Sequence, residues 1–307
     1  MAEIMQLRFL LFFLFSIALS QNQAVEFQLK GKVKTVESTT YLVLDDTQTT
    51  ASGFLDSEYF DAVKLDFDHQ GNLVLRQNYL DYQGKLGLFD KTIYWYNPEN
   101  QLEKTETTLV QNGEEPTRIS QTKNYYYLAN KLVRGDEFNF GRTTNQTWVI
   151  IYKYFHQNLS EKEFWMEDEI FSKEIHTYDL TNSPESIQTF HNDGKLGQII
   201  FFQYAEKRNL KNKITETGNE KIVESFEYEN GLLKTLILKD SKDEIQMRKT
   251  YYPSGLPATI EKKDYNQNRL LKYDFKFTFD SQNNWINCLI LEDEKQKFRI
   301  VRKINYH

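Results

Sequence analysis

Acidic residues at alternate positions are the most frequent groups in this sequence that could do chemistry. Asp66 and Asp68 form one such pair, and Glu167, Asp168 and Glu169 form another acidic group. Side chains at positions i and i+2 of a β-strand point to the same face, so two carboxylates could act as the acid and base of a glycoside hydrolase. The same alternation puts acidic pairs on any solvated sheet, and it therefore singles out no catalytic residue.

Signals for metal binding and for a nucleophile are missing from the sequence. The five histidines, of which His69, His156 and His191 lie in turn-like segments, show no i, i+4 pair, and Cys288 is the only cysteine. The acidic group at 167–169 lacks the spaced aspartates of a calcium loop. No Gly-x-Ser-x-Gly motif and no phosphate-binding glycine loop occurs. We predict no metal site and no cofactor.

Clusters of aromatic residues are the strongest candidates for ligand contact. Consecutive rings such as Tyr125, Tyr126 and Tyr127 must lie on both faces of a strand. Packing in a core accounts for most such rings, whereas exposed ones could stack on sugars or peptides in a groove. The candidate ligand-binding residues are Tyr94, Trp95, Tyr96 and Trp165.

The elements that must position these residues are predicted from a recurring turn. An aromatic residue, a short polar stretch, often a glycine, and an apolar residue recur from Phe67–Leu73 to Phe279–Trp285, and adjacent copies begin 12 to 14 residues apart. Asp or Asn opens such a turn and Gly or Asn accepts its positive φ, which leaves one strand of about 8–10 residues between turns. The glycines predicted to have positive φ are Gly71, Gly84, Gly194, Gly231 and Gly255.

The fold class predicted from this pattern is all-β: one long antiparallel meander of repeated hairpins. Because neighbouring strands twist, we expect the sheet to coil or curl as an open array, with Phe275 and Phe277 inside and Lys276 and Thr278 in solvent. Equal burial of the two pairs would instead indicate a sandwich or a closed barrel. Phe298–Tyr306 is expected to cap the array or form its edge. The sequence also allows a short helix near Phe164–Ile175 and a loop over 45–60.

The turn motif of an aromatic residue, Asp, two further residues, Gly, any residue and Leu resembles the YD repeats of RHS-type bacterial surface and secreted proteins. Two end segments, Leu29–Val36 and Tyr273–Trp285, are similar to segments of uncharacterised exported repeat proteins of Bacteroidetes. The resemblance implies a secreted or cell-envelope β-sheet array without assigned chemistry.

The start of the chain is typical of a secretory signal peptide. Arg8 precedes the apolar run Phe9–Phe15, and Ala18 and Ser20 are small residues before a predicted cut at Gln21. We therefore expect residues 1–20 to be a signal peptide and 21–307 to be a single β-repeat domain, with repeats over about 63–285 and a C-terminal cap over about 286–307. The predicted location is the periplasm, the cell surface or the extracellular space, without an integral membrane segment once the signal peptide is removed.

Charge and composition narrow the possible partners. The chain carries a net charge of −6, and its charged residues (27%) are interspersed rather than clustered. This argues against nucleic acid or an anionic membrane surface as the main partner. The interpretation we favour is an exported, non-enzymatic binding or structural module of the bacterial cell envelope, whose partner would be an envelope polysaccharide or a protein. The alternative is a polysaccharide-active hydrolase that uses paired carboxylates on the sheet.

Overall fold

A computed structural model describes residues 27, 29–44, 47–50, 62–82, 85–110, 118–141, 144–205, 208–265 and 269–307. Every regular element in these ranges is a β-strand, and the turn periodicity correctly predicted an all-β meander. The strands are β1 (Val33–Leu44), β2 (Thr47–Thr50), β3 (Ala62–Phe67), β4 (Leu73–Tyr82), β5 (Lys85–Tyr96), β6 (Leu102–Leu109), β7 (Arg118–Leu128), β8 (Lys131–Phe140), β9 (Asn145–Phe155), β10 (Asn158–Met166), β11 (Glu169–Tyr178), β12 (Pro184–His191), β13 (Leu196–Tyr204), β14 (Leu210–Thr217), β15 (Glu220–Glu229), β16 (Leu232–Lys239), β17 (Ile245–Tyr251), β18 (Pro257–Asp264), β19 (Arg269–Phe279), β20 (Trp285–Glu292) and β21 (Lys295–Tyr306).

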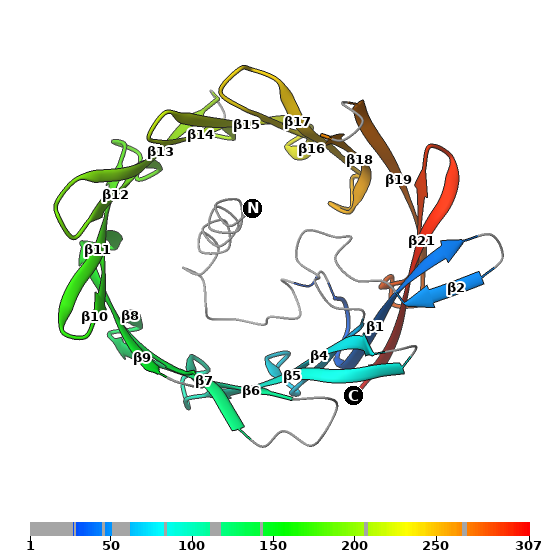
Figure 1. Cartoon of the computed structure of the whole chain (residues 1–307), viewed down its shortest axis with the longest axis horizontal. Helices are drawn as coiled ribbons and strands as arrows, with labels where there is room; N and C mark the ends of the chain where they lie inside the picture. Colours follow the sequence, from blue (N-terminus) through cyan, green and yellow to red (C-terminus); the bar gives the residue numbers. More distant parts are fainter. Residues whose placement is uncertain are drawn as a thin grey trace.

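The sheet closes on itself through β1, which lies between β3 and β21. Val36 faces Leu65 of β3 on one side and Ile304 of β21 on the other, both in antiparallel register. From β3 to β21 each strand pairs antiparallel with the next one along the chain. All the described strands except β2, twenty of the 21, therefore form a closed barrel, and β2 pairs with the end of β1 at Tyr41–Leu44 (Figure 1).

The barrel wall is a single layer of strands (Figure 1). Twenty strands spaced about 4.8 Å apart enclose a ring roughly 30 Å or more across, which is too wide for side chains of opposite walls to meet. The described residues form no second sheet that covers the wall, and most side chains of strands such as β14, β15 and β17 are only half-buried. Closure satisfies the backbone edges that an open array would leave unpaired.

The two faces of the wall follow from the cross-strand pairs, because directly opposed residues share a face. Traced around the barrel, one face carries the following buried apolar side chains of the strands: Val36, Val63, Leu65, Ile187, Ile200, Phe275, Cys288, Ile290 and Ile300. This is the concave inner face, on which side chains converge. Phe27 and Leu29, which precede β1, also pack on it.

The apolar core is concentrated where the ends of the chain meet. One cluster includes Val36, Leu65 and Phe67, and the other includes Phe275 and Ile290. Together they cover the inner side of β1, β3 and β19–β21, which we call the seam. Phe275 and Ile290 are at most 1% exposed, whereas no other sector of the described wall has such a cluster. The seam thus provides the main apolar stabilisation of the closed state.

The recurring turn has one backbone geometry at eight places in the described chain. Its first residue donates its N–H to the carbonyl of the fifth, and the fourth donates to the carbonyl of the first. The fourth residue has positive φ in each copy: Gly71, Asn100, Asn182, Gly194, Arg208, Asp243, Gly255 and Asn283. Gly231, in a shorter turn, also has positive φ as predicted, and Gly84 lies outside the described residues. The turn chemistry was therefore correctly predicted.

The aromatic residue of the repeat ties neighbouring hairpins together at one end of the barrel, which we call the tyrosine rim. There the hydroxyl of Tyr96 donates to the carbonyl of Leu73 at 2.9 Å, and Tyr127 does the same to Leu102 at 3.0 Å. Tyr154 and Tyr178 repeat the contact with Leu132 and Leu159. The turns β3–β4, β5–β6, β7–β8, β9–β10 and β11–β12 line this rim, each two strands from the next. We call the opposite end of the barrel the acidic rim, and it includes the β10–β11, β16–β17 and β20–β21 turns.

Several expectations from the sequence were wrong. The sheet is closed rather than an open coil, although Phe275 is buried while Lys276 and Thr278 are exposed. Burial is unequal because no described element covers the outer face. Comparing these residues could therefore not distinguish an open coil from a closed barrel.

The end of the chain also differs from the prediction. Phe298–Tyr306 is no edge, since β21 pairs with β20 and with β1. The stretch from Phe164 to Ile175 belongs to strands β10 and β11, and the predicted loop over 45–60 contains β2. Residues 1–20, where we predict the signal peptide, lie outside the described residues.

Candidate functional site

The outer face of β5–β11 carries two parallel rows of side chains that include aromatic rings, of which Tyr126 is exposed and Trp95 and Trp165 are half-buried. One row consists of the cross-strand partners Trp95, Lys104, Asn124, Asp136, Val149 and Trp165. The row beside it consists of Tyr126, Arg134, Ile151, Glu163 and Lys173. We call these two rows the outer strip. It crosses seven strands, from β5 to β11. The two tryptophans lie on β5 and β10, so at about 4.8 Å per strand they are roughly 24 Å apart.

A shallow hollow lies toward each end of the outer strip. The first is lined by Trp95, Glu103, Lys104, Asn124, Tyr125 and Tyr126. The second is lined by Arg134, Asn145, Thr147, Val149, Ile151, Trp165, Glu167 and Asp168. Tyr126, 46% exposed, and Arg134 stand between them, with the guanidinium 5.8 Å from the centre of the ring. An extended ligand could therefore lie across both hollows.

The middle of the outer strip is held by an ion pair. Arg134 donates to the Asp136 carboxylate from Nε at 2.7 Å and from Nη2 at 3.3 Å. Burial and the neighbouring Asp136 carboxylate raise the pKa of the Tyr126 phenol, which stays protonated and able to donate a hydrogen bond. These side chains form planar donors and acceptors of fixed orientation beside the ring.

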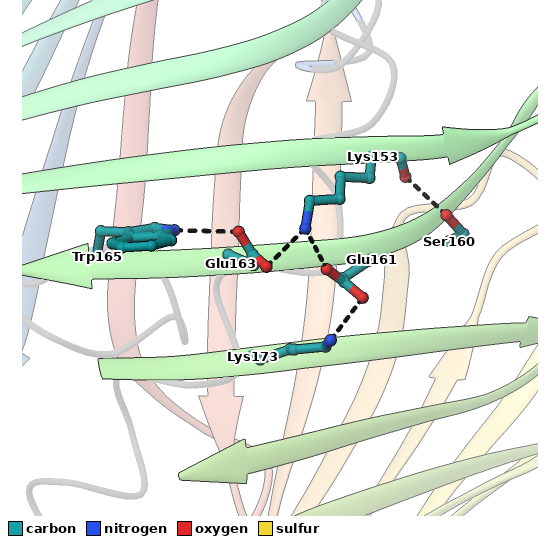
Figure 2. Close-up of polar contacts among 6 residues, drawn as sticks. All are labelled: Lys153, Ser160, Glu161, Glu163, Trp165 and Lys173. Carbon is teal, nitrogen blue, oxygen red and sulfur yellow. Dashed lines mark hydrogen bonds and ion pairs between the residues drawn. The ribbon is translucent and has the colours of Figure 1, made fainter. Parts of the chain in front are cut away.

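The Trp165 end is oriented by a chain of charged groups (Figure 2). The indole N–H of Trp165 donates to Glu163 at 3.1 Å, and Lys153 Nζ donates to both Glu163 and Glu161 at 2.6 Å. Lys173 lies 2.7 Å from the other oxygen of Glu161. Burial would raise the pKa of Glu161, but hydrogen bonds from the two lysines lower it to about 2. The network therefore keeps the Glu161 carboxylate ionised and the indole ring in place.

The four candidate residues from the sequence separate onto the two faces. Trp95 and Trp165 lie on the outer strip, where Lys104 sits 5.1 Å from the centre of the Trp95 ring. Tyr94 packs against the inner cluster of the seam, and burial raises the pKa of its phenol. The hydroxyl of Tyr96 donates to the carbonyl of Leu73 at the tyrosine rim. Two of the four, Trp95 and Trp165, thus lie on the outer face, and their role in binding remains a prediction.

Sequence reasoning missed the polar partners of the tryptophans, namely Lys104, Asn124, Arg134 and Asp136. Their type is ordinary for a solvated strand, and only the register of five strand pairs brings them beside Trp95 and Trp165. The alternation of Tyr125, Tyr126 and Tyr127 did indicate that one ring would face away from its neighbours.

In the acidic pair Asp66 and Asp68, which was considered for hydrolysis, each carboxylate lies near another group of the wall. Asp68 accepts the backbone N–H groups of Gln70 and Asn72 and so closes its turn, and Asp66 lies 3.9 Å from Lys64. A glycosidase needs one carboxyl whose pKa is raised so that it can donate a proton. Beside the outer strip, hydrogen bonds from two lysines lower the pKa of the Glu161 carboxyl instead, so Glu161 does not fit that role.

The part of the chain that the structure describes contains no group of three or more His, Cys, Asp or Glu residues arranged to hold a metal ion. It also contains no helix long and apolar enough to cross a bilayer.

Comparisons with known proteins give distant likenesses. No family model matches the sequence, and no curated protein matches it. Among solved structures, the chain is similar to a porin-like protein from Bacteroides uniformis (10% identity, 90% of this chain and 99% of that one, TM-score 0.36). A porin-like protein from Bacteroides vulgatus gives 10% identity, 91% and 99% coverage and a TM-score of 0.27. The Photorhabdus luminescens Tc holotoxin pore gives 13% identity, 77% and 16% coverage and a TM-score of 0.23. The resemblance to YD repeats remains a prediction.

Proposed function

We propose that this protein is an exported, non-enzymatic binding module of the bacterial cell envelope, and that it binds polysaccharide on the outer strip. The observation that carries the proposal is the set of three rings on the two rows, Trp95, Tyr126 and Trp165, interleaved with fixed hydrogen-bonding side chains such as Arg134 and Asp136. Aromatic faces pack on the apolar faces of sugars, and planar polar groups pair with hydroxyls. Spacing along the row suits an extended chain of several sugars.

A protein ligand fits the outer strip less well. Peptides commonly add a strand to an exposed sheet edge, and the wall beneath the outer strip has a paired neighbour on both sides of every strand from β6 to β9. A helical partner needs a continuous apolar groove, whereas polar Asn124 and Asp136 interrupt the rings. Sugar recognition therefore accounts for more of the observed side chains.

The rest of the outer face supports a location in which the wall contacts water. Charged pairs lie in the middle of strands far from the outer strip, including Arg248 with Glu261 at 3.0 Å and Lys272 with Asp274 at 3.1 Å. Charged groups at such positions are costly beside acyl chains and ordinary beside water. The periplasm and the cell surface both meet this condition.

The proposal is tested by binding to purified envelope polysaccharides, with affinity measured by calorimetry. Trp165→Ala and Tyr126→Ala are each expected to weaken binding about tenfold, which corresponds to about 1.4 kcal/mol. Phe201→Ala is the matched control, because Phe201 is an exposed ring (37%) on the outer face of β13, outside the outer strip. Binding that survives both strip substitutions, or release of reducing ends from the polysaccharide, would refute a non-enzymatic site here.

A further inference from the structure

Three successive hairpins of the tyrosine rim expose a large apolar side chain at their tips. Leu128 is 70% exposed beside the β7–β8 turn, Phe155 is 70% exposed beside the β9–β10 turn, and Leu180 is fully exposed in the β11–β12 turn. A single exposed apolar residue is unremarkable, but here one occurs at each of three neighbouring tips. Tips two strands apart are about 10 Å from each other, so the three form a row roughly 20 Å long.

The row is held by contacts from tip to tip. Lys131, at the first tip, donates its ammonium to the backbone carbonyl of His156 at the second and lies 4.9 Å from the centre of the Tyr154 ring. The amide of Asn158 at the second tip donates to Asn182 at the third at 3.3 Å. The apolar side chains are therefore presented together by a preorganised rim, which reduces the entropy lost when they bind.

The groups around the three side chains are polar and mostly uncharged. The tips themselves read Ala129-Asn130, His156-Gln157 and Asp179–Ser183, and the carboxylate of Asp179 is occupied by the backbone N–H groups of its own turn. The three apolar side chains are separated from one another and form no continuous apolar patch. This arrangement suits a soft surface into which each side chain can insert by itself. Amide and hydroxyl groups between apolar side chains suit the boundary between lipid headgroups and acyl chains, where polar and apolar surroundings lie side by side.

The opposite end of the barrel has another character. Tips of the acidic rim carry Glu167 and Asp168, a turn that contains Asp240, Asp243 and Glu244, and the pair Asp293 and Glu294. Inserting these charged groups among lipid headgroups and acyl chains would be costly. Of the two ends, the tyrosine rim is therefore the better suited to approach a membrane surface end-on.

We propose that the barrel rests on a lipid bilayer through its tyrosine rim, with Leu128, Phe155 and Leu180 inserted into the headgroup region. The partner is the lipid surface itself, and a zwitterionic surface fits the nearly neutral tips. The wall of β5–β11, with the outer strip, then stands upright from the membrane. This inference goes beyond the proposed function and does not depend on it.

The test is co-sedimentation of the exported protein with phosphatidylcholine vesicles. The triple variant L128S/F155S/L180S is expected to lose binding, with the partition coefficient falling about tenfold for each side chain removed. The control is L196S/Y265S, which removes exposed apolar side chains (51% and 75%) from the acidic rim and should leave binding unchanged. Each variant is exported with its own leader, so the expected signal peptide, residues 1–20, is removed before the assay and does not contribute to vesicle binding.

A second measurement locates the contact. An environment-sensitive dye on Leu180→Cys should shift to the blue when vesicles are added, and the same dye on Leu196→Cys should not. Both substitutions lie at exposed positions, and Cys288 is buried away from the reagent. Equal sedimentation of the triple variant and the control, or equal dye shifts at both positions, would overturn the proposal. Loss of polysaccharide binding in the outer-strip variants with vesicle binding retained leaves it standing.

Discussion

The seam and the wall opposite it are built from the same hairpins but are stabilised in different ways. At the seam, Phe275, Ile290 and Ile300 are at most 1% exposed and pack into one apolar cluster. In β9 of the opposite wall, Val149 and Ile150 lie on different faces and neither is buried. The difference shows that joining the two ends of the chain relies on apolar burial, whereas the wall relies on strand pairing, turns and polar contacts between hairpins.

The largest expected effect comes from opening the seam. Phe275→Ala should lower the free energy of unfolding by about 3–5 kcal/mol, the usual cost of emptying a buried aromatic site. Phe201→Ala, on the exposed outer face of β13, should cost less than about 1 kcal/mol. Urea denaturation followed by near-ultraviolet circular dichroism measures both. Similar losses at the two positions would show that the seam is not a distinct stabilising region.

A smaller effect is expected from a turn of the wall. Gly194 has φ of +76° and nothing within 4 Å of the place where a side chain would begin, so Gly194→Val meets only backbone strain. That strain should cost about 1–2 kcal/mol. Gly194→Asn should cost less, because Asn100 and Asn182 occupy the same turn position with φ of 63°. Equal destabilisation by Val and Asn in urea denaturation would contradict this account.

The turns and the strand alternation could be predicted from sequence because both are local. Aspartate and glycine specify the turn geometry within five residues, and the alternation around Phe275 specifies its face. Closure could not be predicted, since it depends on β1 pairing with both β3 and β21, contacts separated by up to about 270 positions in the chain. The outer strip was half predicted for the same reason: Trp95 and Trp165 are recognisable as aromatics, but their polar neighbours are set by register.

The tyrosine rim tests the difference between wall and seam. In the wall, tyrosine hydroxyl bonds stabilise neighbouring hairpins, whereas the seam is stabilised by apolar packing. Tyr127→Phe removes the bond to the carbonyl of Leu102, a residue only 3% exposed, and should cost about 1 kcal/mol. Burial also raises the pKa of Tyr127 to about 12, so its ionisation at high pH should break the same contact. Tyr126→Phe, on the outer face, is the control for stability. If the Tyr127→Phe protein were as stable as the control, the tyrosine hydroxyl bonds of the tyrosine rim would not contribute to the stability of the wall.

The smallest expected effect concerns the charged network behind Trp165, which has no counterpart in the apolar clusters of the seam. Glu161 has its pKa lowered from 4.5 to about 2 in the folded protein. A carboxyl whose folded pKa is lowered adds stability above its unfolded pKa and loses it as pH falls toward the folded value. Replacing Glu161 by Gln should therefore make unfolding less sensitive to pH between about 5 and 2.

The size of that effect is expected to stay below about 1 kcal/mol, because Lys153 is half-exposed and solvent screens the pair. Urea midpoints at about pH 5 and pH 3 measure it. Glu229→Gln is the matched control, since Glu229 pairs with Lys234 at 3.1 Å but is 63% exposed. The wild type and the control should lose the same stability on acidification, and Glu161→Gln should lose less. An unchanged acid sensitivity in Glu161→Gln would mean that the lysines beside it do not stabilise the wall, and that Trp165 is oriented by packing instead.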